Sequence, residues 1–61
     1  MPIFITVELD DERALALAQF VKRVGWQEIR VNAVSDDEAY AMRDAIAAVA
    51  DGLQARGYAP R

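Results

Sequence analysis

Side chains capable of acid–base or nucleophilic chemistry are few in this sequence. It contains no histidine to titrate near neutral pH and no cysteine to act as a thiolate. Its ten carboxylates could in principle supply an acid–base pair, but a chain of 61 residues can hardly enclose a substrate. The remaining candidate nucleophiles or acids are Thr6, Lys22, Ser35, Tyr40 and Tyr58. We therefore predict that the protein is not an enzyme, and we assign no catalytic residue.

Metal and cofactor sites are not indicated either. Without histidine and cysteine ligands, zinc and haem sites of the ordinary types are excluded. Two acidic triplets, at 10–12 and 36–38, are typical of helix N-termini, where negative charge interacts favourably with the helix dipole. We prefer that interpretation to a dedicated cation site. The three glycines are far apart and form no phosphate-binding loop, so we expect no cofactor.

The longest helical pattern spans residues 36–56. Ser35, followed three residues later by Glu38, predicts a capping box at its start, and Gly57 predicts an end in the left-handed conformation. Beside the apolar stripe lies a ridge of small residues that includes Gly52, which costs about 1 kcal/mol relative to alanine. A close helix crossing would explain that glycine. The stripe itself consists of Ala39, Met42, Ile46, Val49 and Leu53, spaced three and four apart.

The remaining elements complete an α-rich α+β fold in a single small domain of residues 1–61. Residues 3–9 are rich in β-branched and aromatic side chains and end at an acidic cluster, which predicts an N-terminal strand. Residues 10–24 begin with acids and end with Lys-Arg before Gly25, which predicts a first long helix. Residues 26–34 fit either a short helix, which we favour, or a second strand. The tail after Gly57, residues 58–61, is expected to be extended, with Tyr58 folded back on the last helical turn.

A chain of this size needs help to bury a sufficient core. Below about 70 residues a domain usually depends on disulfides, a metal or a partner subunit, and the first two are excluded here. A lone strand at 3–9 must also pair with something. It could pair across a homodimer, which we expect, or with residues 28–34 of the same chain if they form a strand. A stable monomer in sedimentation equilibrium would contradict the dimer.

The charge and hydropathy of the chain restrict its partners further. The net charge of −3 disfavours non-specific binding to DNA or to anionic membranes, since attraction to phosphate needs clustered lysine and arginine. No stretch approaches the length of a membrane span, and no signal-peptide pattern opens the chain. We therefore expect a cytoplasmic protein that binds another protein.

The run from Val7 to Ile29, VELDDERALALAQFVKRVGWQEI, resembles the start of the ribbon-helix-helix repressors. That resemblance, which covers the first half of the chain, implies a dimer whose strands pair antiparallel and whose outward strand side chains contact DNA in the major groove. Those positions are Phe4, Thr6 and Glu8 here. One is apolar, one is acidic and no basic residue precedes them, so the resemblance supports the architecture more than DNA binding.

A second resemblance covers nearly the whole chain. Residues 16–26, 32–34, 38–40, 42–45 and 57–61 are similar to a group of short uncharacterised proteins from integrative elements and prophages of Gram-negative bacteria, which have no assigned activity. This resemblance implies that the chain is a small accessory protein of a mobile element. By analogy, acidic proteins of this size in that setting include inhibitors that occupy the nucleic-acid-binding surfaces of host defence complexes.

The sequence therefore predicts a non-enzymatic, homodimeric protein–protein interaction module, an accessory protein of a mobile element, with inhibition of a host defence complex as one expected role. The alternative is a ribbon-helix-helix regulator that binds DNA. Aromatic side chains supply anchors at interfaces, although Phe20 and Trp26 could instead fill the small core. The candidate interface residues are Phe4, Thr6, Phe20, Trp26 and Tyr40.

Overall fold

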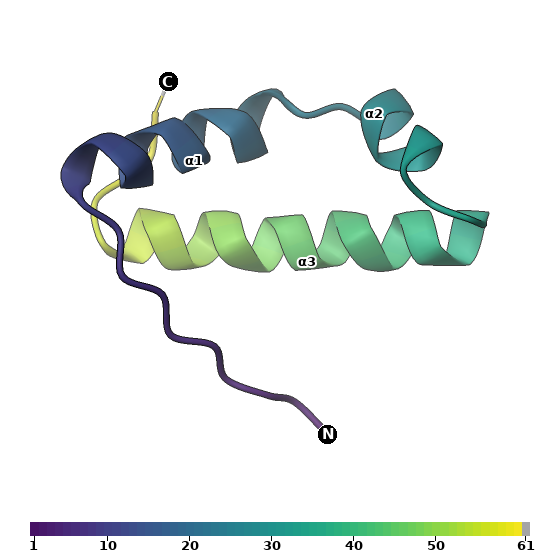
Figure 1. Cartoon of the computed structure of the whole chain (residues 1–61), viewed down its shortest axis with the longest axis horizontal. Coiled ribbons are helices and arrows are strands. Elements are labelled where there is room, and N and C mark those ends of the chain that lie inside the picture. Colours follow the sequence, from purple (N-terminus) through teal and green to yellow (C-terminus); the bar gives the residue numbers. More distant parts are fainter. Residues whose placement is uncertain (61) are drawn as a thin grey trace.

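Three helices follow an extended N-terminal segment in the computed structural model, which describes residues 1–60 (Figure 1). They are α1 (Asp11–Arg23), α2 (Trp26–Val31) and α3 (Asp36–Ala55). The first two lie end to end in one layer, and α3 runs beneath both of them (Figure 1). The result is a thin molecule of 34 × 29 × 15 Å. Arg61, which belongs to the tail that the sequence predicts to be extended, lies outside the described residues.

Local side-chain signals fix where α1 and α2 begin. The Asp10 carboxylate accepts a hydrogen bond from the backbone N–H of Arg13 at 2.8 Å, so Asp10 is the N-cap of α1. The backbone N–H of Gly25 donates to the Glu28 carboxylate at 3.1 Å, which ties the start of α2 to its own first turn. Both bonds satisfy or fix backbone groups that a helix end would otherwise leave without a partner.

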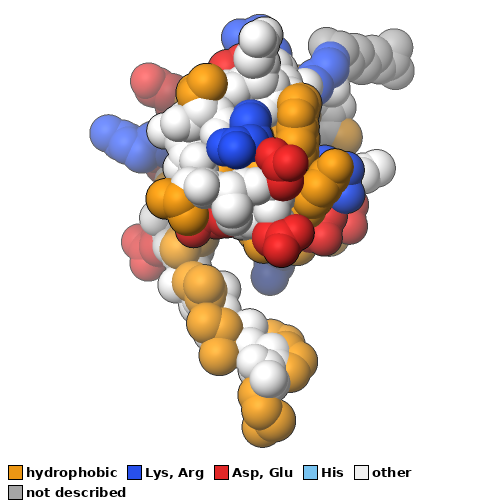
Figure 2. Space-filling view, turned by 90° about the vertical axis from the view of Figure 1, so that its right-hand side faces the viewer, with side chains coloured by type: hydrophobic (Ala, Val, Ile, Leu, Met, Phe, Trp, Pro, Cys, Tyr) orange, Lys and Arg blue, Asp and Glu red, His pale blue; other side chains and the backbone are white. Residues whose placement is uncertain are grey.

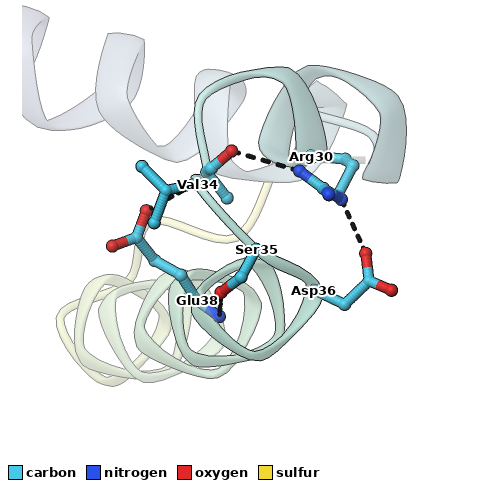
Figure 3. A network of polar contacts seen from close by, with 6 residues as sticks. Arg30, Val34, Ser35, Asp36 and Glu38 are labelled. Carbon is cyan, nitrogen blue, oxygen red and sulfur yellow. Dashed lines mark hydrogen bonds and ion pairs between the residues drawn. The ribbon is translucent and has the colours of Figure 1, made fainter.

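The turn between α2 and α3 is held by four side-chain hydrogen bonds (Figure 3). Ser35 accepts from the backbone N–H of Glu38 at 3.2 Å, as its capping position predicts. The Glu38 carboxylate accepts from the N–H of Val34 at 2.9 Å, one residue earlier than a capping box requires. Arg30 donates to Asp36 at 2.6 Å and to the carbonyl of Ala33 at 3.1 Å. Together these bonds fix how α2 approaches the N-terminus of α3.

The C-terminal end of α3 is closed by a glycine in the left-handed conformation, as the sequence predicts. Gly57 has a φ of 93°, and its N–H donates to the carbonyl of Gln54 at 2.9 Å. The N–H of Tyr58 donates to the carbonyl of Leu53 at 2.9 Å, which completes a Schellman motif. The Tyr58 hydroxyl then donates to the Asp11 carboxylate, which fastens the C-terminal tail to the start of α1.

The interior is small and consists mostly of alanine. Among the described residues, only Ala14, Ala18, Ile29 and Ala39 are buried, and no large side chain is fully buried. Alanine lets helices approach closely but removes little apolar surface from water. The three helices therefore gain little of the hydrophobic stabilisation that a larger core would supply.

The predicted α+β fold is wrong, because the described chain is all-helical. Residues 3–9 are extended but form no strand, and residues 26–31 are helical, so no second strand exists among residues 1–60. Strand formation requires a neighbouring segment within hydrogen-bonding distance, and the described part of this chain places none beside residues 3–9. The N-terminal strand on which the ribbon-helix-helix resemblance depends is therefore absent from the described chain. Instead, Phe4 is 98% exposed and the apolar side chains around it lie in solvent.

The close helix crossing expected at Gly52 is also not observed in the described chain. A Cβ atom built at Gly52 meets no atom within 4 Å.

We therefore predict that Gly52→Ala raises the free energy of unfolding by about 1 kcal/mol, because alanine loses less backbone entropy in a helix. The matched control is Gly57→Ala, which should lower it by about 1–2 kcal/mol because φ is positive there. Urea unfolding followed by circular dichroism measures both, and a destabilising Gly52→Ala would contradict the open surface.

A second prediction concerns the Tyr58–Asp11 bond at high pH. The hydrogen bond to Asp11 raises the pKa of the Tyr58 phenol above 10.0, with added contributions from desolvation and from the charges of Asp11 and Asp10. A pKa raised in the folded state stabilises the protein below pH 10.0 and ceases to do so as pH rises through the folded-state value. Stability should therefore fall above pH 10.0 in the wild type and fall less in Tyr58→Phe. Urea midpoints across that range, with Tyr40→Phe as the control, would show it, and identical profiles would contradict it.

Candidate interaction surfaces

The N-terminal arm, defined as residues 1–9, is the most exposed apolar part of the chain. It leaves the start of α1, passes the C-terminal end of α3 and runs away from the helices (Figure 1). Within residues 1–60, no hydrogen bond or ion pair involves the arm. Figure 2 shows that its hydrophobic side chains project away from the helical body. The candidate residues Phe4 and Thr6 both lie here, exposed and without a contact partner.

A groove lies where the end of α1, α2 and the middle of α3 meet. It has a volume of about 600 Å³ and a mainly apolar lining, and we call it the helix groove. Phe20, another candidate residue, lines it and is 59% exposed, so it does not fill the core. The other lining residues are Val24, Ile29, Met42, Ala45 and Ile46, with Arg23, Glu28 and Asn32 as the polar members.

Trp26 and Tyr40, the last two candidates, are brought together on a different part of the surface. Their rings from α2 and α3 lie 4.9 Å apart between centroids, at an interplanar angle of 35°. The Arg43 guanidinium carbon lies 5.1 Å from the centre of the Tyr40 ring, within the range of a cation–π interaction. Trp26 is 42% and Tyr40 48% exposed. The cluster therefore joins two helices and still presents aromatic surface to solvent.

The described surface carries more negative than positive charge. Arg13, Arg30 and Arg43 each pair with an aspartate, and all three pairs are exposed. Pairs of this kind contribute little to stability, about 0–1 kcal/mol each. Within residues 1–60, Lys22 and Arg23 make no ion pair. No group of acidic side chains in that part of the chain has the geometry to hold a metal ion, and none of its helices is long and apolar enough to cross a membrane.

Sequence reasoning missed the helix groove. The spacing of Met42 and Ile46 correctly places them on one apolar stripe, but spacing does not show whether another element covers that stripe. The opposing residues Phe20, Val24 and Ile29 are also large and apolar, and the sequence does not show that they leave an opening over the stripe. The stacking of Trp26 on Tyr40 was also missed, since it depends on how two helices cross.

Comparison with known proteins places the chain in a family. The match covers residues 1–61. The chain belongs to a family of unknown function, DUF7706. No curated protein and no solved structure matches it. Membership of this family assigns no activity or partner, so a function must be argued from the surfaces described above.

The aromatic cluster leads to a prediction about stability. Tyr40→Ala removes an aromatic pair and a cation–π contact, and should lower the free energy of unfolding by about 1 kcal/mol beyond the loss of buried area. Trp26 is the only tryptophan, so its fluorescence emission should shift in the same variant. Tyr40→Phe keeps the ring and should leave both measurements nearly unchanged. An unaltered emission spectrum in Tyr40→Ala would show that the rings do not stack.

Proposed function

We propose that this chain is a small, non-enzymatic protein–protein interaction module that forms a homodimer and binds a second protein. The observation that carries the proposal is the N-terminal arm, whose apolar side chains lie in solvent although the rest of the chain has little core. Monomeric proteins rarely expose contiguous apolar surface of this kind unless it meets a partner. The arm therefore supports an interface that a single copy leaves uncovered.

Burial of the arm stabilises the protein only if it outweighs the conformational entropy that the arm loses. Burying one exposed isoleucine, valine or phenylalanine side chain stabilises a protein by about 1.5–3 kcal/mol. The arm has four such side chains, Ile3, Phe4, Ile5 and Val7, and all are exposed. Ordering the backbone costs about 1–2 kcal/mol per residue, so burial of the arm must be extensive to be favourable. A dimer doubles both the gain and the cost, so its arms must also cover apolar surface on the folded part of the partner chain, where burial requires little further ordering of the backbone.

The acidic surface supports a basic partner for the dimer. Three acids open α3 and remain exposed, and among residues 1–60 only Asp36 of the three pairs with an arginine. Electrostatic complementarity of this kind selects partners and speeds association. A protein surface that normally binds nucleic acid has the matching charge, as in the expected role of a host defence inhibitor from a mobile element.

DNA binding has less support. No lysine or arginine occurs in residues 1–9, and Phe4 and Thr6 of the arm are not held in any fixed register by the described chain. Phosphate contacts supply most of the affinity of proteins for DNA, and this arm offers none. A salt-sensitive, sequence-specific shift in electrophoretic mobility, lost in Thr6→Ala, would favour the regulator over the interaction module.

The homodimer is tested by sedimentation equilibrium of the full chain with a matched pair of variants. Ile5 is 77% exposed on the arm, and Val31 is 78% exposed on α2, outside both the arm and the helix groove. We expect the wild type and Val31→Asp to be dimers at micromolar concentration and Ile5→Asp to dissociate at least about tenfold more readily, a change of about 1.4 kcal/mol. A monomeric wild type would overturn the proposal.

A further inference from the structure

We infer that the helix groove of each copy receives the N-terminal arm of a second copy, so that two arms are exchanged reciprocally. This inference rests on the proposed homodimer and adds the surface at which it forms. The arm and the groove are both apolar and exposed, and they belong to the same chain. Reciprocal exchange buries both arms and both grooves in one closed, two-fold arrangement.

The side chains of the arm suit the groove. In an extended chain alternate residues face the same way, so Ile3, Ile5 and Val7 form one apolar row. The groove presents aliphatic side chains from all three helices, among them Ile29 and Ile46. Its volume of about 600 Å³ is within the range of pockets that enclose several such groups.

Charge complementarity favours the same arrangement. Glu8 is the only charged side chain in the arm. Arg23 lines the groove and makes no ion pair within residues 1–60, whereas the Glu28 carboxylate is already held by the N–H of Gly25. A seated arm can therefore place the Glu8 carboxylate beside the Arg23 guanidinium.

The N-terminal arm of the same chain fits the helix groove less well, because part of its length is needed to reach the groove. It starts beside Asp11, whereas the groove begins near Phe20, and nine residues of helix separate these positions by about 14 Å. An arm folded back along α1 would use about four extended residues to cover that distance. Only residues 1–5 would then enter the groove, and Val7 and Glu8 would lie short of it. The arm of a second copy has no such restriction, because it is not tied to the start of the same α1.

Disulfide cross-linking tests this cleanly because the chain has no cysteine of its own. Full chains carrying Val7→Cys are mixed with chains carrying Ala45→Cys, so that any bond between the two kinds of chain joins two copies. A disulfide forms only where Cα atoms approach within about 7 Å. We expect a 7–45 linked dimer on non-reducing gels. Gln54→Cys, at an exposed position outside the helix groove, is the control and should form no link with Val7→Cys.

A second pair of variants tests the groove without new bonds. Ala45 lines the groove and Ala47 does not, and both are exposed on α3. Ala45→Glu should weaken dimerisation at least about tenfold, while Ala47→Glu should leave it unchanged. Circular dichroism confirms that both variants keep their helices. Equal dimer affinities in the two variants would overturn the inference.

The remaining outcomes separate the inference from the proposed function. A dimeric wild type in which Val7→Cys copies link only to each other overturns arm exchange but leaves the homodimer standing. A chain with both Val7→Cys and Ala45→Cys that links internally as a dilute monomer shows the chain's own arm in the groove and also overturns the exchange. A wild type that sediments as a monomer overturns both proposals.

Discussion

Packing through alanine is the constraint on which the rest of this structure depends. Ala14 and Ala18 of α1 and Ala39 of α3 are three of the four side chains that are buried in the described part of the chain. Small side chains let the helices approach closely and make a thin molecule, only 15 Å deep. They also leave little apolar surface removed from water, so the helical body is held together as much by its caps and turns as by its core.

The larger apolar side chains are consequently displaced to the outside. Phe20 lines an open groove, Trp26 and Tyr40 stack at the surface, and the whole N-terminal arm is exposed. In a larger domain such residues would fill the interior. Here they form the surfaces at which a second copy or another protein can gain the area that the monomer lacks. The same alanine-rich sequence therefore has two results: the core is small, and large apolar side chains are left on the surface, where they are available for binding.

The helix ends could be predicted from the sequence because their causes are local. Ser35 and Gly57 each act on backbone groups within a few residues and take the predicted roles, and one of the acids predicted to open the first helix, Asp10, is its N-cap. The strand at 3–9 was predicted wrongly because a strand depends on a second segment, and an alternating pattern shows only which side chains are apolar. For the same reason, no local pattern revealed the helix groove or the contact between Trp26 and Tyr40.

Thermal unfolding at different protein concentrations tests most directly whether the chain depends on a second copy. If folding is coupled to dimer formation, mass action makes Tm rise as the concentration increases. We expect a clear rise over a roughly 100-fold range of concentration, and a smaller rise in Ile5→Asp. A Tm that stays constant over that range would show that the three helices are sufficient on their own, and would contradict the central claim.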